Sequence, residues 1–213
     1  MRKLLILDCD GVLYPASNIS HNDFVFAFNK TQEYYKDKNF KIEESDLKSA
    51  AQFWNAIYKK CLEKECAFDE FCKQMIANIN YKKIRKSVVL LSLLKATRKK
   101  FDIAVLSDNH HYHLEQILKH RFNLGINDFK SIGIDCYDIT STEKDGKFFP
   151  KCDEKALKNF IKKQGRDISD CIFIDNSHAN IMAGKKIGMT SIYIYRKRSL
   201  QKCLRDLNSK KFI

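Results

Sequence analysis

Several polar side chains in this sequence follow short apolar runs, and their residue types could support phosphate or metal chemistry. They are Asp8 and Asp10 at the end of run 3–8, Ser107 in run 102–108, and Asp175 with Asn176 in run 171–176. Carboxylates that lie close together raise each other's pKa unless a cation lies among them. Oxygen ligands of this kind suit a hard divalent ion such as Mg²⁺. The pattern therefore predicts a cation site, provided that the fold brings these groups together.

The elements that must position these groups follow from the alternation of apolar patterns. Four short apolar runs predict strands, at 3–8, 102–108, 171–176 and 190–195, and helical patterns lie between them, at 114–122, 156–161 and 181–187. Strands that alternate with helices favour an α/β fold, a Rossmann-like parallel sheet core with helices on both faces. Polar residues at the carboxyl ends of such strands converge on one site.

Residues 17–86 break this alternation, because they contain helical patterns and no run typical of a strand. The clearest pattern is an apolar stripe over 47–62, which includes Trp54 and Tyr58. We expect both rings to pack within the segment, the alternative being that one of them stacks on a nucleobase or sugar. The sequence thus predicts an α/β core domain at 1–16 and 87–213 and an inserted helical domain at 17–86.

Composition limits the classes of partner. The chain has 213 residues with 39 Lys and Arg against 26 Asp and Glu, a formal net charge of +13 that favours acidic partners. A small phosphorylated metabolite fits this charge, and nucleic acid is disfavoured because no basic motif interleaved with aromatics and no zinc-finger spacing is present. The absence of a signal-peptide pattern and of a membrane-length apolar run predicts a cytoplasmic protein with reduced cysteines and no membrane contact. We expect a monomer or a homodimer, a choice on which the sequence carries no signal.

Three neighbouring histidines raise the question of a zinc site. His110, His111 and His113 follow the predicted second strand, but their spacing on a helix does not place all three on one side. We therefore expect roles at the surface or at the start of the helix, with substrate contact as the alternative.

Three sequence motifs resemble those of the haloacid dehalogenase superfamily. Asp-Cys-Asp-Gly-Val-Leu-Tyr-Pro (8–15) is similar to its first motif, Val-Leu-Ser-Asp-Asn (105–109) to its second, and 173–189 to its fourth. The resemblance extends from residue 3 to about 195, and the helical insertion occupies the position of that family's C1 cap. Within the superfamily, Leu-Tyr-Pro after the first motif looks most like pyrimidine 5′-nucleotidase-type phosphatases.

The resemblance implies a role for each matching residue. Asp8 would be the nucleophile, and Asp10 would protonate the leaving group and later activate water. Phosphate would be bound by Ser107, Asp108 and one lysine, for which the family's Lys-Pro-x-Pro pattern favours Lys147 over its rival Lys151. The residues implied as metal ligands are Asp8, Asp10, Asp175 and Asn176. Asn176 departs from the two consecutive acids of many relatives, so it could weaken the metal site or leave Asp175 as the direct ligand.

Together these features predict a Mg²⁺-dependent phosphatase that hydrolyses a small phosphomonoester, such as a nucleoside 5′-monophosphate, through an aspartyl-phosphate. One alternative is a phosphosugar mutase on the same scaffold. Another is a non-catalytic member of the family that binds RNA or an acidic partner. A dehalogenase is disfavoured, because Asp10 and the acidic fourth motif serve phosphate chemistry.

Overall fold

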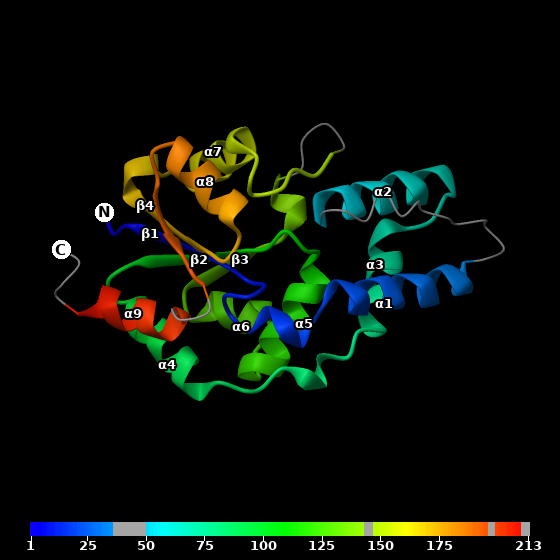
Figure 1. Ribbon diagram of the computed structural model, residues 1–213, viewed down its shortest axis with the longest axis horizontal. Helices are drawn as coiled ribbons and strands as arrows, with labels where there is room; N and C mark the ends of the chain where they lie inside the picture. The colour runs from blue at the N-terminus through cyan, green and yellow to red at the C-terminus, as the bar shows by residue number, and fades with distance from the viewer. Residues whose placement is uncertain (36–49, 143–146, 196–198, 210–213) are drawn as a thin grey trace.

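The computed structural model describes residues 1–35, 50–142, 147–195 and 199–209. Its centre is a five-stranded, fully parallel sheet with the strand order β3-β2-β1-β4-β5 (Figure 1). The strands are β1 (Leu4–Asp8), β2 (Asp102–Leu106), β3 (Ile134–Tyr137), β4 (Cys171–Asp175) and β5 (Thr190–Tyr193). The sequence predicted all of these except β3, an edge strand whose sequence, Ile-Asp-Cys-Tyr, does not form an apolar run.

The register of the sheet places the motif residues at one edge. Asp8, the last residue of the central strand β1, pairs with Leu106 of β2, and Leu7 pairs with Ile174 of β4. The residues that follow these strands therefore leave the sheet side by side, as expected for the carboxyl ends of parallel strands.

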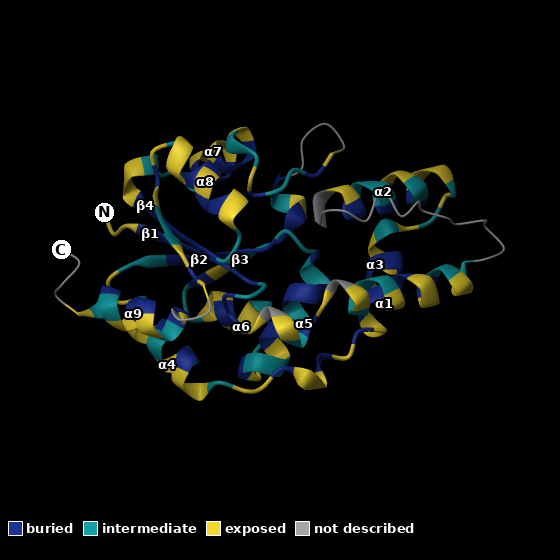
Figure 2. Ribbon diagram, in the orientation of Figure 1, coloured by how far each residue is buried: buried dark blue, intermediate teal, exposed yellow. Residues whose placement is uncertain are grey.

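Helices cover both faces of the sheet, as predicted. Side chains of β1 alternate between two apolar clusters, with Leu5 and Leu7 in one and Leu4 and Ile6 in the other. The first face is covered by α4 (Val88–Thr97), α5 (His111–Phe122), α6 (Ile126–Ser131) and α9 (Leu200–Asn208), and the second by α7 (Glu154–Lys163) and α8 (His178–Lys186) (Figure 1). Figure 2 shows the result as buried strands between helices whose outer surfaces are exposed.

The inserted segment forms a group of helices at one end of the sheet (right in Figure 1). These are α1 (His21–Tyr34), α2 (Ala50–Glu63) and α3 (Phe68–Ala77), and α3 packs against both α1 and α2. Leu47, part of the predicted apolar stripe, lies outside the described residues, and Leu62 of that stripe is exposed. Buried side chains of the three helices belong to the same apolar cluster as the first face of the sheet, so the insertion packs directly on the core.

Four short 3₁₀ helices complete the described elements: η1 (Ala16–Asn18), η4 (Tyr81–Lys83), η5 (Ile139–Thr142) and η6 (Ile168–Asp170). All eight cysteines are free thiols, as predicted. Within the described ranges, no helix combines the length and apolar character that crossing a bilayer requires.

Asp23 links the segment by which the chain enters the insertion to the segment by which it leaves. Its carboxylate accepts hydrogen bonds from the backbone N–H and the hydroxyl of Ser20, which begins α1, and it pairs with Lys83 at 2.9 Å. These backbone and side-chain hydrogen bonds lower the pKa of Asp23 to about 2. The ionised carboxylate of Asp23 therefore stabilises the folded chain above the usual carboxyl pKa of about 3.9, and this stabilisation is lost as the pH falls toward 2.

Replacing Asp23 with Ala is expected to lower the free energy of unfolding by about 1 kcal/mol at neutral pH, because the capping box is lost. Urea denaturation measures this change. The neighbouring variant Asn22→Ala serves as control, since Asn22 is exposed in the same first turn. Equal losses in the two variants would contradict a specific role of Asp23.

Candidate active site

The carboxylate of Asp8 lies at the end of β1 in contact with a buried lysine. The ammonium of Lys151 contacts Asp8 Oδ1, lies 3.3 Å from Asp175 Oδ2, and donates to the carbonyl of Leu106 at 3.1 Å. Lys151 is 2% exposed and Asp8 is 4% exposed. The carboxylates of β1 and β4 thus meet around one ammonium, although 167 positions separate them in the sequence (175 − 8).

Burial and neighbouring charges set the protonation of this cluster. Burial raises the pKa of Asp8 well above its usual value, and the carboxylates of Asp175 and Asp10 raise it further, against the opposing effect of Lys151. Burial alone would lower the pKa of Lys151, but Asp175, Asp8 and Asp108 raise it well above its usual value. Lys151 is therefore an ammonium, and the ionised form of Asp8 would be stabilised by a further cation.

Asp175 is held by the chain that follows β4. Its Oδ1 accepts from the backbone N–H of Ser177 at 2.7 Å, and its Oδ2 accepts from the Asn180 side chain at 3.0 Å. Because Oδ2 also faces Lys151, both oxygens have protein donors. Asp175 therefore helps to hold Lys151 beside Asp8.

Asn176 lies where two oxygens of the first motif converge. With its amide nitrogen turned toward them, it donates to Asp8 Oδ2 at 2.9 Å and to the backbone carbonyl of Asp10 at 2.8 Å. Gly11 permits this approach, because a Cβ there would lie 2.2 Å from a terminal atom of the Asn176 amide, and its φ of +82° also favours glycine. A cavity of about 810 Å³ has Gly11, Tyr14 and Asn176 in its lining.

The carboxylate of Asp10 is surrounded by donors. Oδ1 accepts from the Tyr14 hydroxyl and lies 2.9 Å from His113 Nε2, while Oδ2 accepts from Asn109 Nδ2 at 3.0 Å and from Ser107 Oγ at 3.4 Å. Burial opposes the charged form of Asp10. The charge and hydrogen bond of His113, with the hydrogen bonds of Tyr14 and Asn109, nevertheless lower its pKa well below the usual carboxyl value.

The structure corrects the preference between the two lysines. Lys147 is exposed, whereas Lys151 is buried and contacts Asp8. The lysine of the site is therefore Lys151, four residues after the one that the family pattern favours. The side chain of Asp108 is also placed differently from the implied phosphate contact. Its Oδ1 accepts from the backbone N–H of Lys151 at 3.0 Å, and this bond holds the backbone of Lys151 close to the end of β2. Ser107 contacts Asp10 rather than Asp8.

Side chains of the insertion reach the same edge of the sheet. Trp54 is fully buried, which confirms the packing role, and its indole N–H donates to Asn109 Oδ1 at 3.2 Å. Asn55 exchanges two hydrogen bonds with the backbone of Phe148, at 2.8 and 2.9 Å. Residues of α2 thus contact the two core segments that supply Asn109 and Lys151.

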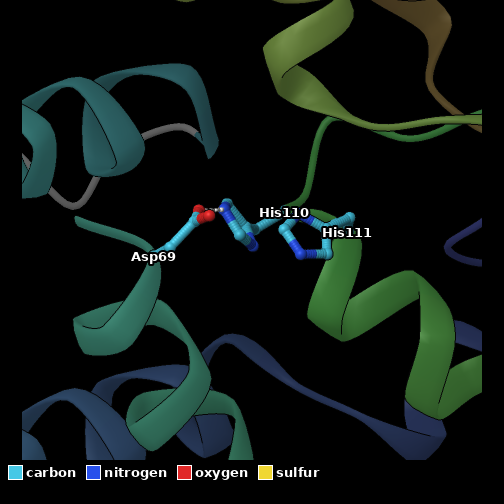
Figure 3. A group of neighbouring side chains, drawn as sticks. All are labelled: Asp69, His110 and His111. Carbon is cyan, nitrogen blue, oxygen red and sulfur yellow. Dashed lines mark hydrogen bonds and ion pairs between the residues drawn. The ribbon is translucent and has the colours of Figure 1, made fainter. Parts of the chain in front are cut away.

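The three histidines lie at the start of a helix, which was one of the two expected roles, and His110 is the N-cap residue of α5. His110 and His113 are fully buried, and His113 belongs to the Asp10 cluster. His110, Asp69 and His111 carry potential metal-ligand atoms within 4.8 Å of one another, and Figure 3 shows His110 between the other two. Burial and the nearby His111 lower the pKa of His110 to about 4, so its neutral ring bonds Asp69 at 3.2 Å and joins α3 to the start of α5.

Three partners of Asp10 were not predicted from the sequence. Tyr14 lies in the first motif and Asn109 in the second, so their motif positions offered a signal. For His113 the only signal in the sequence was its spacing of three residues from His110, which places the two histidines on the same side of a helix.

A family model, haloacid dehalogenase-like hydrolase, matches residues 2–188. Solved structures with the same fold include a HAD-family enzyme from Bacteroides thetaiotaomicron in complex with magnesium and inorganic phosphate. It is 17% identical, with a TM-score of 0.56, over 93% of this chain and 97% of that one. CbbY from Rhodobacter sphaeroides, in complex with phosphate, is 14% identical with a TM-score of 0.53, over 91% of this chain and 86% of that one.

The UTR4 protein of Saccharomyces cerevisiae has the fold as well, at 13% identity and a TM-score of 0.53, over 91% of this chain and 89% of that chain. At these identities the likenesses establish the fold, and the family model establishes the membership. The chain, with its parallel sheet and its acidic strand ends, belongs to the haloacid dehalogenase-like hydrolase family.

Proposed function

We propose that this protein is a Mg²⁺-dependent phosphatase that hydrolyses a small phosphomonoester through an aspartyl-phosphate on Asp8. The observation that carries the proposal is the arrangement around buried Asp8, with Lys151 on one oxygen and, on the other, the Asn176 amide, which also bonds the Asp10 carbonyl. Asp10 is two residues away on the same turn. The magnesium and phosphate named for the Bacteroides enzyme of the same fold support this chemistry.

The residues at this point fit Mg²⁺. Asp8 Oδ2 and the Asp10 carbonyl both lie within hydrogen-bonding distance of one Asn176 nitrogen, so two hard oxygen donors already converge there. These two groups, with the Asn176 amide turned to present its oxygen, would hold the ion. When bound, Mg²⁺ would neutralise charge on Asp8 and the phosphate and align them for in-line displacement.

In the first step, an oxygen of Asp8 attacks phosphorus while the bond from phosphorus to the leaving oxygen breaks. Because the pKa of Asp10 lies well below the usual carboxyl value, Asp10 must first take up a proton from solvent, which it then gives to that leaving oxygen. Lys151 neutralises charge on the phosphoryl oxygens, where it is most effective in the transition state. In the second step Asp10 takes a proton from water, the water oxygen attacks phosphorus, and the bond from phosphorus to Asp8 breaks to release phosphate.

The domain division belongs to the same proposal. Residues 1–16 and 87–213 would form the catalytic core, and residues 17–86 a C1-type cap that closes over the site and excludes water. The hydrogen bonds of Trp54 and Asn55 to the core support such a position. Because specificity would reside in cap residues, nucleoside 5′-monophosphates are the first class to test, as the Leu-Tyr-Pro resemblance indicates.

A panel of phosphomonoesters, assayed for released phosphate with purified protein and Mg²⁺, tests the proposal. Release from at least one member of the panel is the expected result. Transfer of phosphate between positions of a sugar phosphate without release would instead indicate a mutase. Binding of RNA without turnover, with an affinity that falls steeply with salt, would indicate a polyanion-binding protein.

Removal of divalent cations with EDTA is expected to lower turnover by at least about 100-fold, and added Mg²⁺ should restore it.

The variant Asn176→Asp adds a charged oxygen ligand, so we expect about tenfold less Mg²⁺ to be needed for half-maximal activity. Asn127→Asp adds the same charge on α6 as a control. Full activity in EDTA, or equal shifts in the two variants, would contradict a metal site at Asn176.

A further inference from the structure

A buried histidine connects Asp10 to the inserted segment. His113 lies in the first turn of α5 and is fully buried. Its Nε2 is 2.9 Å from Asp10 Oδ1, and its Nδ1 is 2.7 Å from the hydroxyl of Tyr81, which is 4% exposed. Two buried groups, Tyr81 and His113, and the partly exposed carboxylate of Asp10 therefore form one continuous hydrogen-bonded chain.

The chemistry of these groups fixes the direction of the hydrogen bonds. A carboxylate offers only acceptors, so Nε2 of His113 must carry the proton that faces Asp10. The Tyr81 hydroxyl, which can donate or accept, bonds Nδ1 on the other side of the ring. Tyr81 thus holds the imidazole in the orientation in which Nε2–H faces Asp10.

The surroundings of His113 come from both parts of the chain. Tyr81 belongs to η4, at the end of the inserted segment, and the ring of Phe24 in α1 lies 5.0 Å from the imidazole ring. His113 itself is on a core helix that packs on the sheet. The position of Asp10 therefore depends on side chains of the insertion as well as on the core.

We infer that His113, oriented by Tyr81, is a positioning residue for Asp10 and holds its carboxylate in the one orientation from which it serves as acid and base. This inference rests on the proposed function, because Asp10 has that role only in phosphomonoester hydrolysis. The ring of His113 bonds Asp10 and Tyr81 and not Asp8 or Lys151, so its effect passes through Asp10. Its loss should therefore affect the proton transfer more than the attack on phosphorus.

Substrates with different leaving groups separate these two effects. An aryl phosphate releases a stable phenolate and needs little help from an acid, whereas an alkyl phosphate needs its leaving oxygen protonated. His113→Leu is expected to lower kcat for an alkyl phosphate by about 100-fold or more and for an aryl phosphate much less, with little change in KM. His113→Gln, whose amide N–H can still donate to Asp10, should recover part of the loss.

His120→Gln is the matched control, because His120 is on the same helix and its ring lies 5.6 Å from that of Tyr81. Its Nδ1, however, bonds the Gln116 carbonyl and not Asp10. We expect wild-type kinetics on both substrates. Equal losses on aryl and alkyl phosphates in His113→Leu, or no recovery in His113→Gln, would overturn the inference.

A measurement on the tautomer does not depend on activity. In ¹⁵N NMR spectra of the wild-type protein, His113 should carry a proton at Nε2. A ring protonated only at Nδ1 in the wild type would overturn the inference even if the variants failed to fold. Lack of turnover with every phosphomonoester would refute the proposed function, and the tautomer would still decide whether His113 donates to Asp10.

Discussion

Replacing Asp8 with Asn is expected to lower kcat for every phosphomonoester by about 10⁴-fold or more, because the amide cannot form the aspartyl-phosphate. The contact with Lys151 needs only an acceptor, which the amide oxygen supplies. Steady-state kinetics with released phosphate as the readout measures the loss. The control is Asp135→Asn, an exposed carboxylate on β3, which should leave kcat unchanged.

The same variant should not destabilise the fold. The pKa of Asp8 is raised mainly by burial, so the ionised carboxylate is less favourable in the folded chain than in water. Above that raised pKa, a neutral Asn relieves this penalty, and Lys151 keeps Asp175 as its partner. We expect an equal or higher Tm together with the lost activity. Retained turnover in Asp8→Asn would refute Asp8 as the nucleophile. A large fall in Tm would show that the ionised Asp8 stabilises the folded chain, contrary to this argument.

The convergence of Asp8, Ser107 and Asp175 could be predicted from the sequence because it depends on two general rules. Apolar runs of this length between helical patterns form parallel strands, and the carboxyl ends of such strands share one edge. Each of these residues lies at or just after the end of its strand, so backbone topology alone places it. No side-chain detail was needed for this step.

The choice between Lys147 and Lys151 could not be made in the same way. Both lie in a connection between strands, where neither periodicity nor register fixes a position. The deciding contact is the hydrogen bond from the Lys151 backbone to the Asp108 carboxylate, which joins two segments 43 residues apart. Similarly, the role of His113 depends on Tyr81 of the insertion, and no local pattern reveals that partner.

Replacing Lys151 with Met is the second variant with a large expected effect, on both stability and rate. The ammonium lies between Asp8 and Asp175, which are 4% and 0% exposed, so its removal leaves two buried carboxylates without their shared cation. Breaking a buried pair in this way destabilises a protein by about 3–5 kcal/mol. We expect a loss of that size in the free energy of unfolding at neutral pH, measured by urea denaturation. We also expect kcat to fall by at least about 10³-fold.

Lys147→Met is the matched control, because Lys147 is an exposed lysine four residues earlier in the same connection. Its replacement should change stability by less than about 0.5 kcal/mol and leave kcat unchanged. The double variant Lys151→Met with Asp8→Asn separates charge from catalysis: removing one of the two carboxylates should recover part of the lost stability but none of the activity. If Lys147→Met were inactive while Lys151→Met turned over normally, the assignment of Lys151 to the phosphoryl group would be wrong.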